Sequence, residues 1–162
     1  PPPYLPPRLD SSAASDVYKR QVLIAPDVGE RSELFLRFGK TFFDARLVES
    51  PEIVVERLLE REAVLSTGIG GGVAVPHAQV PGLGRLALAA STHPAGLAYP
   101  SLDQEPVHLV FCLLGDVNTS ADHLAGLARL ARLARRRDSL TPLVGAADGA
   151  SFVEELGRLE ES

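Results

Sequence analysis

A long, almost uncharged stretch in the middle of the chain constrains its fold more than any other feature. Between Glu62 and Asp103 the only formally charged residue is Arg85. Four short apolar runs lie within this stretch and just after it, most with glycine or proline close by, which is typical of strands. They cover 73–75, 86–91, 97–99 and 107–114. The last run, VHLVFCLL, is hydrophobic almost without interruption, as expected of a strand covered on both faces.

Helical patterns precede this stretch. Apolar residues recur at three- and four-residue spacing over 30–44, which predicts an amphipathic helix. They are Leu34, Phe35, Phe38 and Phe42. Ser50, Pro51 and Glu52 supply an N-cap serine, a proline at the first helical position and an acid in the first turn, so a second helix is predicted to run to about residue 65. Its predicted inner side carries Val54, Leu58, Arg61 and Leu65.

Helical patterns also follow the stretch. One helix is predicted over 120–136, capped by Ser120 or Thr119, and two shorter ones over 138–146 and 150–160. The buried stripe of the first is predicted to be Leu124, Leu127, Ala128, Ala131 and Ala134. A length of 162 residues corresponds to about one domain. Helices, then strands, then helices around one sheet predict an α/β fold, a single-domain sandwich with a central β-sheet flanked by helices.

Charge and composition exclude several classes of function. Sixteen basic against 21 acidic residues give a net charge of −5, which argues against binding to nucleic acid. The single Cys112 excludes an internal disulfide and a zinc site built on paired cysteines. No stretch is long and apolar enough for membrane insertion, so a cytoplasmic protein is expected. Residues 1–21 have neither helical nor strand periodicity and are expected to be a disordered or non-native tail.

The segment most informative about chemistry runs over 61–77 with the sequence REAVLSTGIGGGVAVPH. Glycines permit positive φ and allow a backbone or a phosphate to approach closely, but they also suit a tight connection from helix to sheet. A Walker A loop needs a lysine, and none follows Lys40. A G-x-G-x-x-G pattern that starts at Gly68 would have Val73 at its third glycine. Neither nucleotide-binding motif is therefore present.

This segment resembles the active-site motif of type 2 enzyme IIA (EIIA) domains of the bacterial phosphotransferase system, the fructose, mannitol and nitrogen-regulatory type. Those domains carry RE…STGIG-x-G-(apolar)-A-(apolar)-PH. A second similarity lies downstream, where Asp103-x-x-Pro106-Val107 and an apolar strand are followed by His123-Leu124-x-x-Leu127-Ala128. The resemblance covers about 22–160, so 22–162 is predicted to be one such domain. It also implies a mixed sheet between helices.

The resemblance implies a role for three residues. His77 corresponds to the phosphorylated histidine, whereas His123 and Arg61 correspond to groups that stabilise the phosphoryl group. An imidazole of near-neutral pKa is both a good phosphoryl acceptor and a good leaving group, so transfer can run in either direction. Arg61 supplies a fixed positive group, and His123 lies where a helix N-terminus favours an anion. This chemistry requires no metal or cofactor.

Some residue roles stay open at this level. Arg57 lies one turn before Arg61 on the same predicted face, and composition does not separate the two. Thr67 is expected either to hydrogen-bond the phosphoryl group or a His77 ring nitrogen, or to cap the loop. The four histidines are 15 or 16 residues apart, which does not suit a metal site. His93 and His108 are expected at a strand edge or on the surface.

Two functions of different class follow from the resemblance. In the first, the protein is a phosphotransferase component that accepts a phosphoryl group on His77 from the phosphocarrier protein HPr. It then passes the group to a cysteine of a IIB protein or domain during sugar uptake. In the second, it is a nitrogen-regulatory module in which the phosphorylation state of His77 controls binding to a partner protein. A third interpretation, an unrelated α/β protein with a chance motif, has little support.

Overall fold

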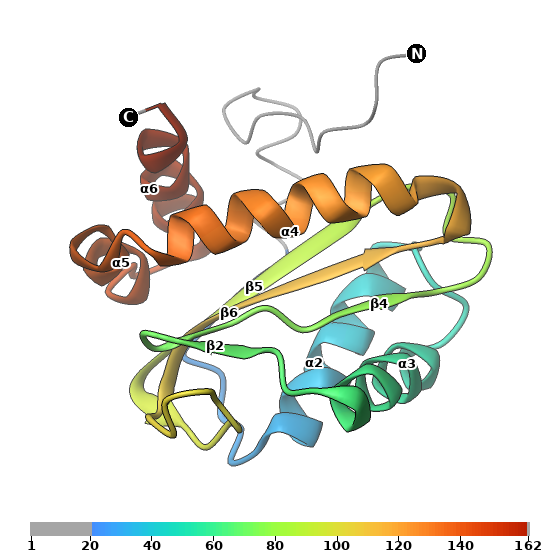
Figure 1. The fold of residues 1–162 in the computed structure, drawn as a ribbon, viewed down its shortest axis with the longest axis horizontal. Coiled ribbons are helices and arrows are strands. Elements are labelled where there is room, and N and C mark those ends of the chain that lie inside the picture. The colour runs from blue at the N-terminus through green and yellow to red at the C-terminus, as the bar shows by residue number, and fades with distance from the viewer. Residues whose placement is uncertain (1–20, 162) are drawn as a thin grey trace.

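The centre of the protein is a six-stranded sheet between two layers of helices, in a computed structural model that describes residues 21–161 (Figure 1). Its strands are β1 (Val22–Ile24), β2 (Gly68–Gly70), β3 (Val73–Ala74), β4 (His77–Gln79), β5 (Ala87–Leu97) and β6 (Val107–Gly115). The order is β1-β5-β6-β3-β2, and β4 also pairs with β6. β6 runs antiparallel to β5 and parallel to β3 and β4. The expected α/β sandwich with a mixed sheet is therefore confirmed.

Helices α2 (Arg31–Asp44) and α3 (Pro51–Val64) cover one face of the sheet. All four apolar residues predicted for the inner side of α2 are fully buried, and Ser50 caps α3 by accepting a hydrogen bond from the Ile53 amide. One expectation for α3 is wrong. Leu65 lies just beyond the helix in an extended conformation that turns the chain toward β2, so its side chain is exposed. Glu62, in the last turn of α3, is buried instead.

The other face is covered by α4 (Ser120–Ala134), α5 (Arg137–Val144) and α6 (Gly149–Glu161), preceded by the short 3-10 helix η1 (Val117–Thr119). The predicted stripe on α4 is right only in part: Ala134 is buried and Leu127 packs against the core, whereas Leu124 and Ala128 are exposed. The buried residues of α4 are His123, Gly126, Leu130, Leu133 and Ala134. Leucine and alanine occur all around this helix, so the sequence permits more than one apolar stripe. Close approach of Gly126 to Leu113 selects the observed one.

The strands differ from the predicted runs at one important place. The runs 86–91 and 97–99 were expected as separate strands, but the single strand β5 contains 87–91 and also Leu97, the first residue of the second run. Its register with β6 is regular up to Thr92 and resumes at Leu97 after an irregularity. Gly96 lies in this irregular part with a φ of +89°, which a residue with a side chain adopts at a cost. The short strands β1, β2 and β4 were not predicted.

The glycine-rich segment forms β2, a tight turn and β3. Gly70, Gly71 and Gly72 have φ values of +88°, +66° and +81°, and consecutive residues in this region are accessible essentially to glycine alone. The Gly71 amide donates to Oδ2 of Asp103 over 2.9 Å, which attaches the turn to the loop before β6. This turn places β3 beside β6. The chain then continues through Pro76 into β4, so that His77 also pairs with β6.

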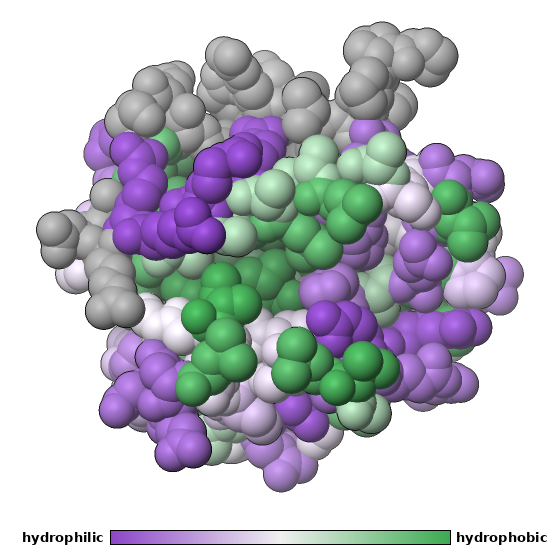
Figure 2. Space-filling model, viewed as in Figure 1, coloured by the Kyte–Doolittle hydropathy of each residue, from purple (hydrophilic) through white to green (hydrophobic). Residues whose placement is uncertain are grey.

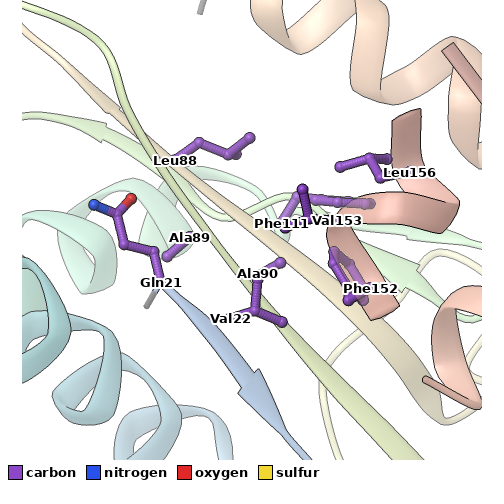
Figure 3. Close-up of a pocket in the computed structure, with 9 residues that line it drawn as sticks. All are labelled: Gln21, Val22, Leu88, Ala89, Ala90, Phe111, Phe152, Val153 and Leu156. Carbon is purple, nitrogen blue, oxygen red and sulfur yellow. The ribbon is translucent and has the colours of Figure 1, made fainter. Parts of the chain in front are cut away.

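A small apolar pocket lies between the sheet and α6, away from the glycine-rich segment (Figure 3). It is lined by Gln21, Val22, Leu88, Ala89, Ala90, Phe111, Phe152, Val153 and Leu156. The tail expected over 1–21 lies outside the described residues apart from Gln21, whose carbonyl accepts a hydrogen bond from the Ala90 amide. Within residues 21–161, no helix has the length and hydrophobicity required to span a membrane.

Candidate active site

His77 is the first residue of β4 and lies half-buried opposite Leu113 of β6. Its ring nitrogen Nδ1 is 2.8 Å from the carbonyl oxygen of Val75. Because a carbonyl only accepts, this contact requires that Nδ1 carry the hydrogen. The other nitrogen, Nε2, then holds a lone pair, so the structure presents Nε2 as the nucleophilic atom of His77.

Arg61 lies in the last turn of α3 and reaches this nitrogen. Its Nε donates to His77 Nε2 over 3.2 Å, and its Nη1 donates to the Leu65 carbonyl over 2.8 Å. The second bond holds the planar guanidinium in place. Arg57 instead has its Nη1 3.8 Å from a Glu60 carboxylate oxygen, and its buried Nε has no hydrogen-bond partner among residues 21–161. The structure thus distinguishes the two arginines and brings Arg61 to His77.

His123 comes from the first turn of α4 and packs against His77. The two ring centroids are 5.6 Å apart, with the ring planes at 67°. His123 is buried, and its Nδ1 has no hydrogen-bond partner in the part of the chain that the structure describes. A side chain at Gly115 would lie 2.7 Å from this nitrogen and 2.9 Å from Oγ1 of Thr119. Gly115 therefore provides the space in which the His123 ring lies.

Asp116 is a buried residue of this region that sequence reasoning missed. Its carboxylate accepts hydrogen bonds from the amides of Asn118 and Gly84, and its own amide donates to Oγ1 of Thr119 over 2.8 Å. The bonds within 116–119 form a capping box at the start of η1, which leads directly into α4. The spacing Asp-x-x-Thr directly after an apolar strand is the sequence pattern from which this cap could have been predicted.

Thr67 does not contact the His77 ring, so the expected hydrogen bond to a His77 ring nitrogen is not formed. Its hydroxyl is buried, contacts a carboxylate oxygen of Glu62 and lies 2.7 Å from the Tyr99 hydroxyl. Both nitrogens of His77 already have partners. The physical reason is that the loop turns the Thr67 side chain into the interior, toward the carboxylate of Glu62.

Burial and neighbouring charges keep the site histidines neutral. Burial lowers the pKa of His77, and the Arg61 guanidinium lowers it further, whereas the hydrogen bond to Val75 and the Glu62 carboxylate raise it. Burial, together with the charge of His77, lowers the pKa of His123 to about 4. Since the ordinary value is 6.5, both rings are neutral at physiological pH. A neutral His77 retains the lone pair that attack on phosphorus requires.

These shifts predict that the protein loses stability in mild acid. Burial lowers the pKa of both His93 and His123 to about 4, from 6.5 in the unfolded chain. Between these values the unfolded chain binds more protons than the folded one, so the free energy of unfolding falls as the pH decreases. Urea unfolding at about pH 7.5 and about pH 4.5 measures this fall. The variant His123→Ala lacks one of the two groups and is expected to show a smaller fall; an equal fall would contradict the assignment.

The remaining histidines do not join the site. His93 is buried inside β5, with its Nε2 2.8 Å from Oγ of Ser91, so the expectation of an edge or surface position is wrong for it. His108 is half-buried, and its Nδ1 donates to the His93 carbonyl. β5 is an inner strand of the sheet, which explains the burial. Among the side chains that the structure describes, no group of three or more from histidine, cysteine, aspartate or glutamate is arranged to hold a metal ion.

Exposed apolar side chains lie on the elements that carry the site. They come from the end of α3, from β2, from the loop before β6, from η1 and from α4, and hydrophobic side chains gather on the face that carries these elements (Figure 2). They are Val64, Leu65, Ile69, Leu102, Val117 and Leu124. Leu65 provides the carbonyl that holds Arg61, and Leu124 directly follows His123. Exposed apolar residues in such a group are typical of a surface that binds another protein.

The fold and the site together define a class of protein. An imidazole nitrogen with a free lone pair faces a fixed guanidinium and a second imidazole in the first turn of a helix. This arrangement is suited to the transfer of an anionic group. The family model described as "Phosphoenolpyruvate-dependent sugar phosphotransferase system, EIIA 2" matches residues 17–158. The chain belongs to this family of type 2 EIIA phosphotransfer domains, whose members carry a phosphohistidine intermediate.

Relatives of both functional branches are similar to the chain. A nitrogen regulatory protein of Bradyrhizobium diazoefficiens is 36% identical over 108 residues, which cover 67% of this chain and 71% of that protein. The fructose-specific EIIABC component of Bacillus subtilis is 35% identical over 99 residues, which cover 61% of this chain but 16% of that much longer protein. These similarities therefore do not distinguish the sugar-specific subtype of the family from the nitrogen-regulatory one.

Solved structures have the same fold. The nitrogen regulatory protein IIA-Ntr of Neisseria meningitidis superposes with a TM-score of 0.78 at 27% identity, over 87% of this chain and 93% of that one. The mannitol IIA of Escherichia coli superposes with a TM-score of 0.68 at 19% identity, over 86% and 95% of the two chains. A complex of IIA-mannitol with phosphorylated IIB-mannitol, also from Escherichia coli, gives a TM-score of 0.70 at 17% identity, over 86% and 95%.

Proposed function

We propose that His77 accepts a phosphoryl group from the phosphohistidine of an HPr-type carrier and passes it to a cysteine of a IIB protein or domain during sugar uptake. The observation that carries the proposal is the geometry of Nε2. This nitrogen holds the lone pair of the ring and lies 3.2 Å from the Arg61 guanidinium, so an arriving phosphoryl group meets both a nucleophile and a cation.

The two transfers are reversible displacements at phosphorus. In the first, the Nε2 lone pair of His77 forms a bond to phosphorus while the bond from phosphorus to the donor imidazole breaks, and its electron pair returns to the donor nitrogen. In the second, a thiolate attacks the same phosphorus and the electron pair of the broken bond returns to Nε2. The hydrogen on Nδ1 stays in its bond to Val75 during both steps, which keeps the ring orientation constant.

Arg61 and His123 stabilise the charge that moves with the phosphoryl group. The transferred group spreads negative charge over three equatorial oxygens, and catalysis depends on positioning and on electrostatic stabilisation. To bind these oxygens, the guanidinium exchanges its contact with Nε2 for contacts with oxygen while Nη1 stays on Leu65. His123 adds a ring N–H from the first turn of α4, where the helix dipole also favours an anion.

The exposed apolar group around the site supports a protein, rather than a small molecule, as the source and the destination of the phosphoryl group. The sugar-specific relative and the structural neighbour that is a complex with IIB support the same direction of transfer. In this proposal the donor and the acceptor bind in turn over Val64, Leu65, Ile69, Leu102, Val117 and Leu124.

A second candidate is a regulatory module of the nitrogen-related branch. The 36% identity to the Bradyrhizobium nitrogen regulatory protein and the TM-score of 0.78 to the Neisseria IIA-Ntr favour it. In that case the phosphorylation of His77 is the same, but the apolar group binds a regulated partner and no sugar is phosphorylated. A change in charge at His77 on phosphorylation would then weaken or strengthen that contact.

The test is reconstitution with labelled phosphoenolpyruvate, enzyme I and HPr. The expected result is stoichiometric label that is labile in acid and stable in base, as for a phosphohistidine. Addition of a IIB protein then separates the two candidates. Rapid transfer of the label to its cysteine supports the sugar branch, whereas label that stays on the protein supports the regulatory one. A protein that acquires no label under these conditions would overturn both.

Replacing His123 with alanine is expected to leave His77 able to accept the label but to slow its formation or its departure. The fold is retained, whereas a group that stabilises the phosphoryl oxygens is lost, and such a loss costs about 100-fold in rate. Rapid-quench measurements of label uptake from HPr and of label release check the expectation. Wild-type rates in both directions would remove His123 from the proposed mechanism.

A further inference from the structure

Glu62 is a buried acidic residue to which the phosphoryl chemistry assigns no role. Its side chain is 1% exposed, although it directly follows Arg61 in the last turn of α3. Its carboxylate accepts hydrogen bonds from the Thr67 amide over 3.2 Å, from the Tyr99 hydroxyl over 2.6 Å and from Nη1 of Arg31 over 3.2 Å. The Thr67 hydroxyl provides a further contact. Four donors thus meet one carboxylate, which is about the number that its two oxygens accept.

The partners of Glu62 come from separate parts of the chain. Arg31 begins α2, Thr67 lies in the loop before β2, and Tyr99 follows β5. Arg31 also lies over the Tyr99 ring, 5.6 Å from its centroid, and the Tyr99 hydroxyl is 2.7 Å from Oγ1 of Thr67. Burying a carboxylate is costly unless it is paired and fully hydrogen-bonded, and an apolar residue in its place would avoid that cost. Stability alone therefore does not explain a carboxylate at this position.

A continuous series of hydrogen bonds connects Glu62 to the nucleophile. The carboxylate accepts from the Thr67 amide, and the Thr67 carbonyl accepts from the Val75 amide over 2.9 Å. The Val75 carbonyl in turn accepts from Nδ1 of His77 over 2.8 Å. This last bond is the one that puts the hydrogen on Nδ1 and the lone pair on Nε2. The position of the Thr67 backbone thus affects which His77 tautomer is formed.

A second connection runs through the end of α3. Arg61 is held by its bond to the Leu65 carbonyl, and Leu65 lies between Glu62 and Thr67 in the sequence. Because Glu62 bonds the Thr67 amide, it closes the loop of residues 62–67 and fixes the Leu65 carbonyl within it. Through the loop of residues 62–67, the Glu62 carboxylate therefore affects the positions of both Arg61 and His77, whose contact is 3.2 Å long.

We propose that Glu62 is a positioning residue for phosphoryl transfer: by holding the Thr67 backbone it keeps His77 in the tautomer with a lone pair on Nε2 and keeps Arg61 against that nitrogen. The inference rests on the proposed function of His77. It assigns Glu62 no contact with the phosphoryl group. Its effect passes through hydrogen bonds that stay in place during transfer.

The test compares Glu62→Gln with wild type. The amide has the same shape but is neutral and has one acceptor oxygen in place of two, so the charge-assisted bonds from the Thr67 amide and Arg31 are weakened. Label uptake from HPr is expected to slow by about tenfold or more. Long-range ¹H–¹⁵N spectra of the histidine rings are expected to show the Nδ1–H form of His77 in wild type. In the variant, the ¹⁵N shifts of the two His77 ring nitrogens are expected to change toward the values of a mixture of the two tautomers.

Tyr99→Phe is the matched control. It removes one donor from the same carboxylate and leaves the Thr67 amide, the Val75 bond and Arg31 in place. It is expected to lower thermal stability while label uptake and the His77 ¹⁵N shifts remain close to wild type. Equal slowing in both variants, or wild-type rate and shifts in Glu62→Gln, would overturn the proposal. Glu62→Asp keeps the charge with a shorter reach and is expected to restore part of the rate. It also provides the same comparison if Glu62→Gln does not fold.

The spectra separate this inference from the proposed function. If wild-type protein accepts no label, the proposed function fails, and the His77 tautomer in wild type, Glu62→Gln and Tyr99→Phe still decides the role of Glu62. If wild-type protein is labelled and the tautomer does not respond to Glu62→Gln, the positioning role fails alone.

Discussion

Replacing His77 with alanine is expected to reduce phosphoryl labelling from phosphoenolpyruvate, enzyme I and HPr to background. The variant lacks the Nε2 lone pair that forms the bond to phosphorus, and no other histidine of residues 21–161 has both a neighbouring guanidinium and a place at this surface. Because His77 is half-buried at the start of a short strand, the fold is expected to survive the substitution. Circular dichroism and thermal unfolding verify that it does.

His108→Ala is the matched control for this result. His108 is also a half-buried histidine on a strand, with its Nδ1 bonded to a backbone carbonyl, but it lies on β6 away from Arg61. It is expected to accept label to the wild-type stoichiometry. Stoichiometric labelling of His77→Ala would assign the phosphoryl group to another residue and remove the basis of the proposed function.

Replacing Arg61 with alanine is expected to have the second largest effect, a slowing of label uptake by about 100- to 1,000-fold. The guanidinium stabilises charge that develops on the phosphoryl oxygens, and nothing else in the described site offers a cation held at His77 Nε2. The variant should also raise the pKa of His77, because the charge of Arg61 lowers it. Rapid-quench labelling measures the first effect, and an NMR titration of the ring measures the second.

Two variants separate this role from general effects of charge. Arg57→Ala removes the arginine one helical turn earlier, which is near Glu60 rather than His77, and it is expected to label at nearly the wild-type rate. Arg61→Lys keeps a positive charge but loses the planar group that bonds Nε2 and Leu65 together, so an intermediate rate is expected. If Arg57→Ala were slower than Arg61→Ala, the assignment of the two arginines would be reversed.

Much of the fold could be predicted from local pattern. The helix over 31–44, the cap at Ser50 and the buried strand over 107–115 follow from spacing and capping chemistry, and the structure has all three. The apolar face of α4 could be predicted only in part, because leucine and alanine occur on several sides of it. The strands β1 and β4 escaped prediction because three residues carry too little periodicity.

The site was predictable to a similar degree. The Pro-His and His-Leu motifs indicated His77 and His123, and Arg61 was one of two candidates. The role of Thr67 depended on which way its side chain points, and nothing distinctive in the sequence indicated Glu62. For Asp116 the Asp-x-x-Thr spacing was a usable signal that was missed. Buried polar networks join residues from distant segments, so their partners emerge only when the segments pack.

The uncharged stretch between Glu62 and Asp103, with its glycines and flanking helices, by itself determined that this chain forms an α/β sandwich and indicated His77 as the proposed phosphoryl acceptor. Both are local properties of pattern and motif. The tertiary structure alone decided that Arg61, not Arg57, meets Nε2, that the rings of His77 and His123 lie 5.6 Å apart, and that Glu62 bonds Thr67. These contacts depend on the rotation of two helices and on the register of β4 against β6, which are set by packing across the whole core.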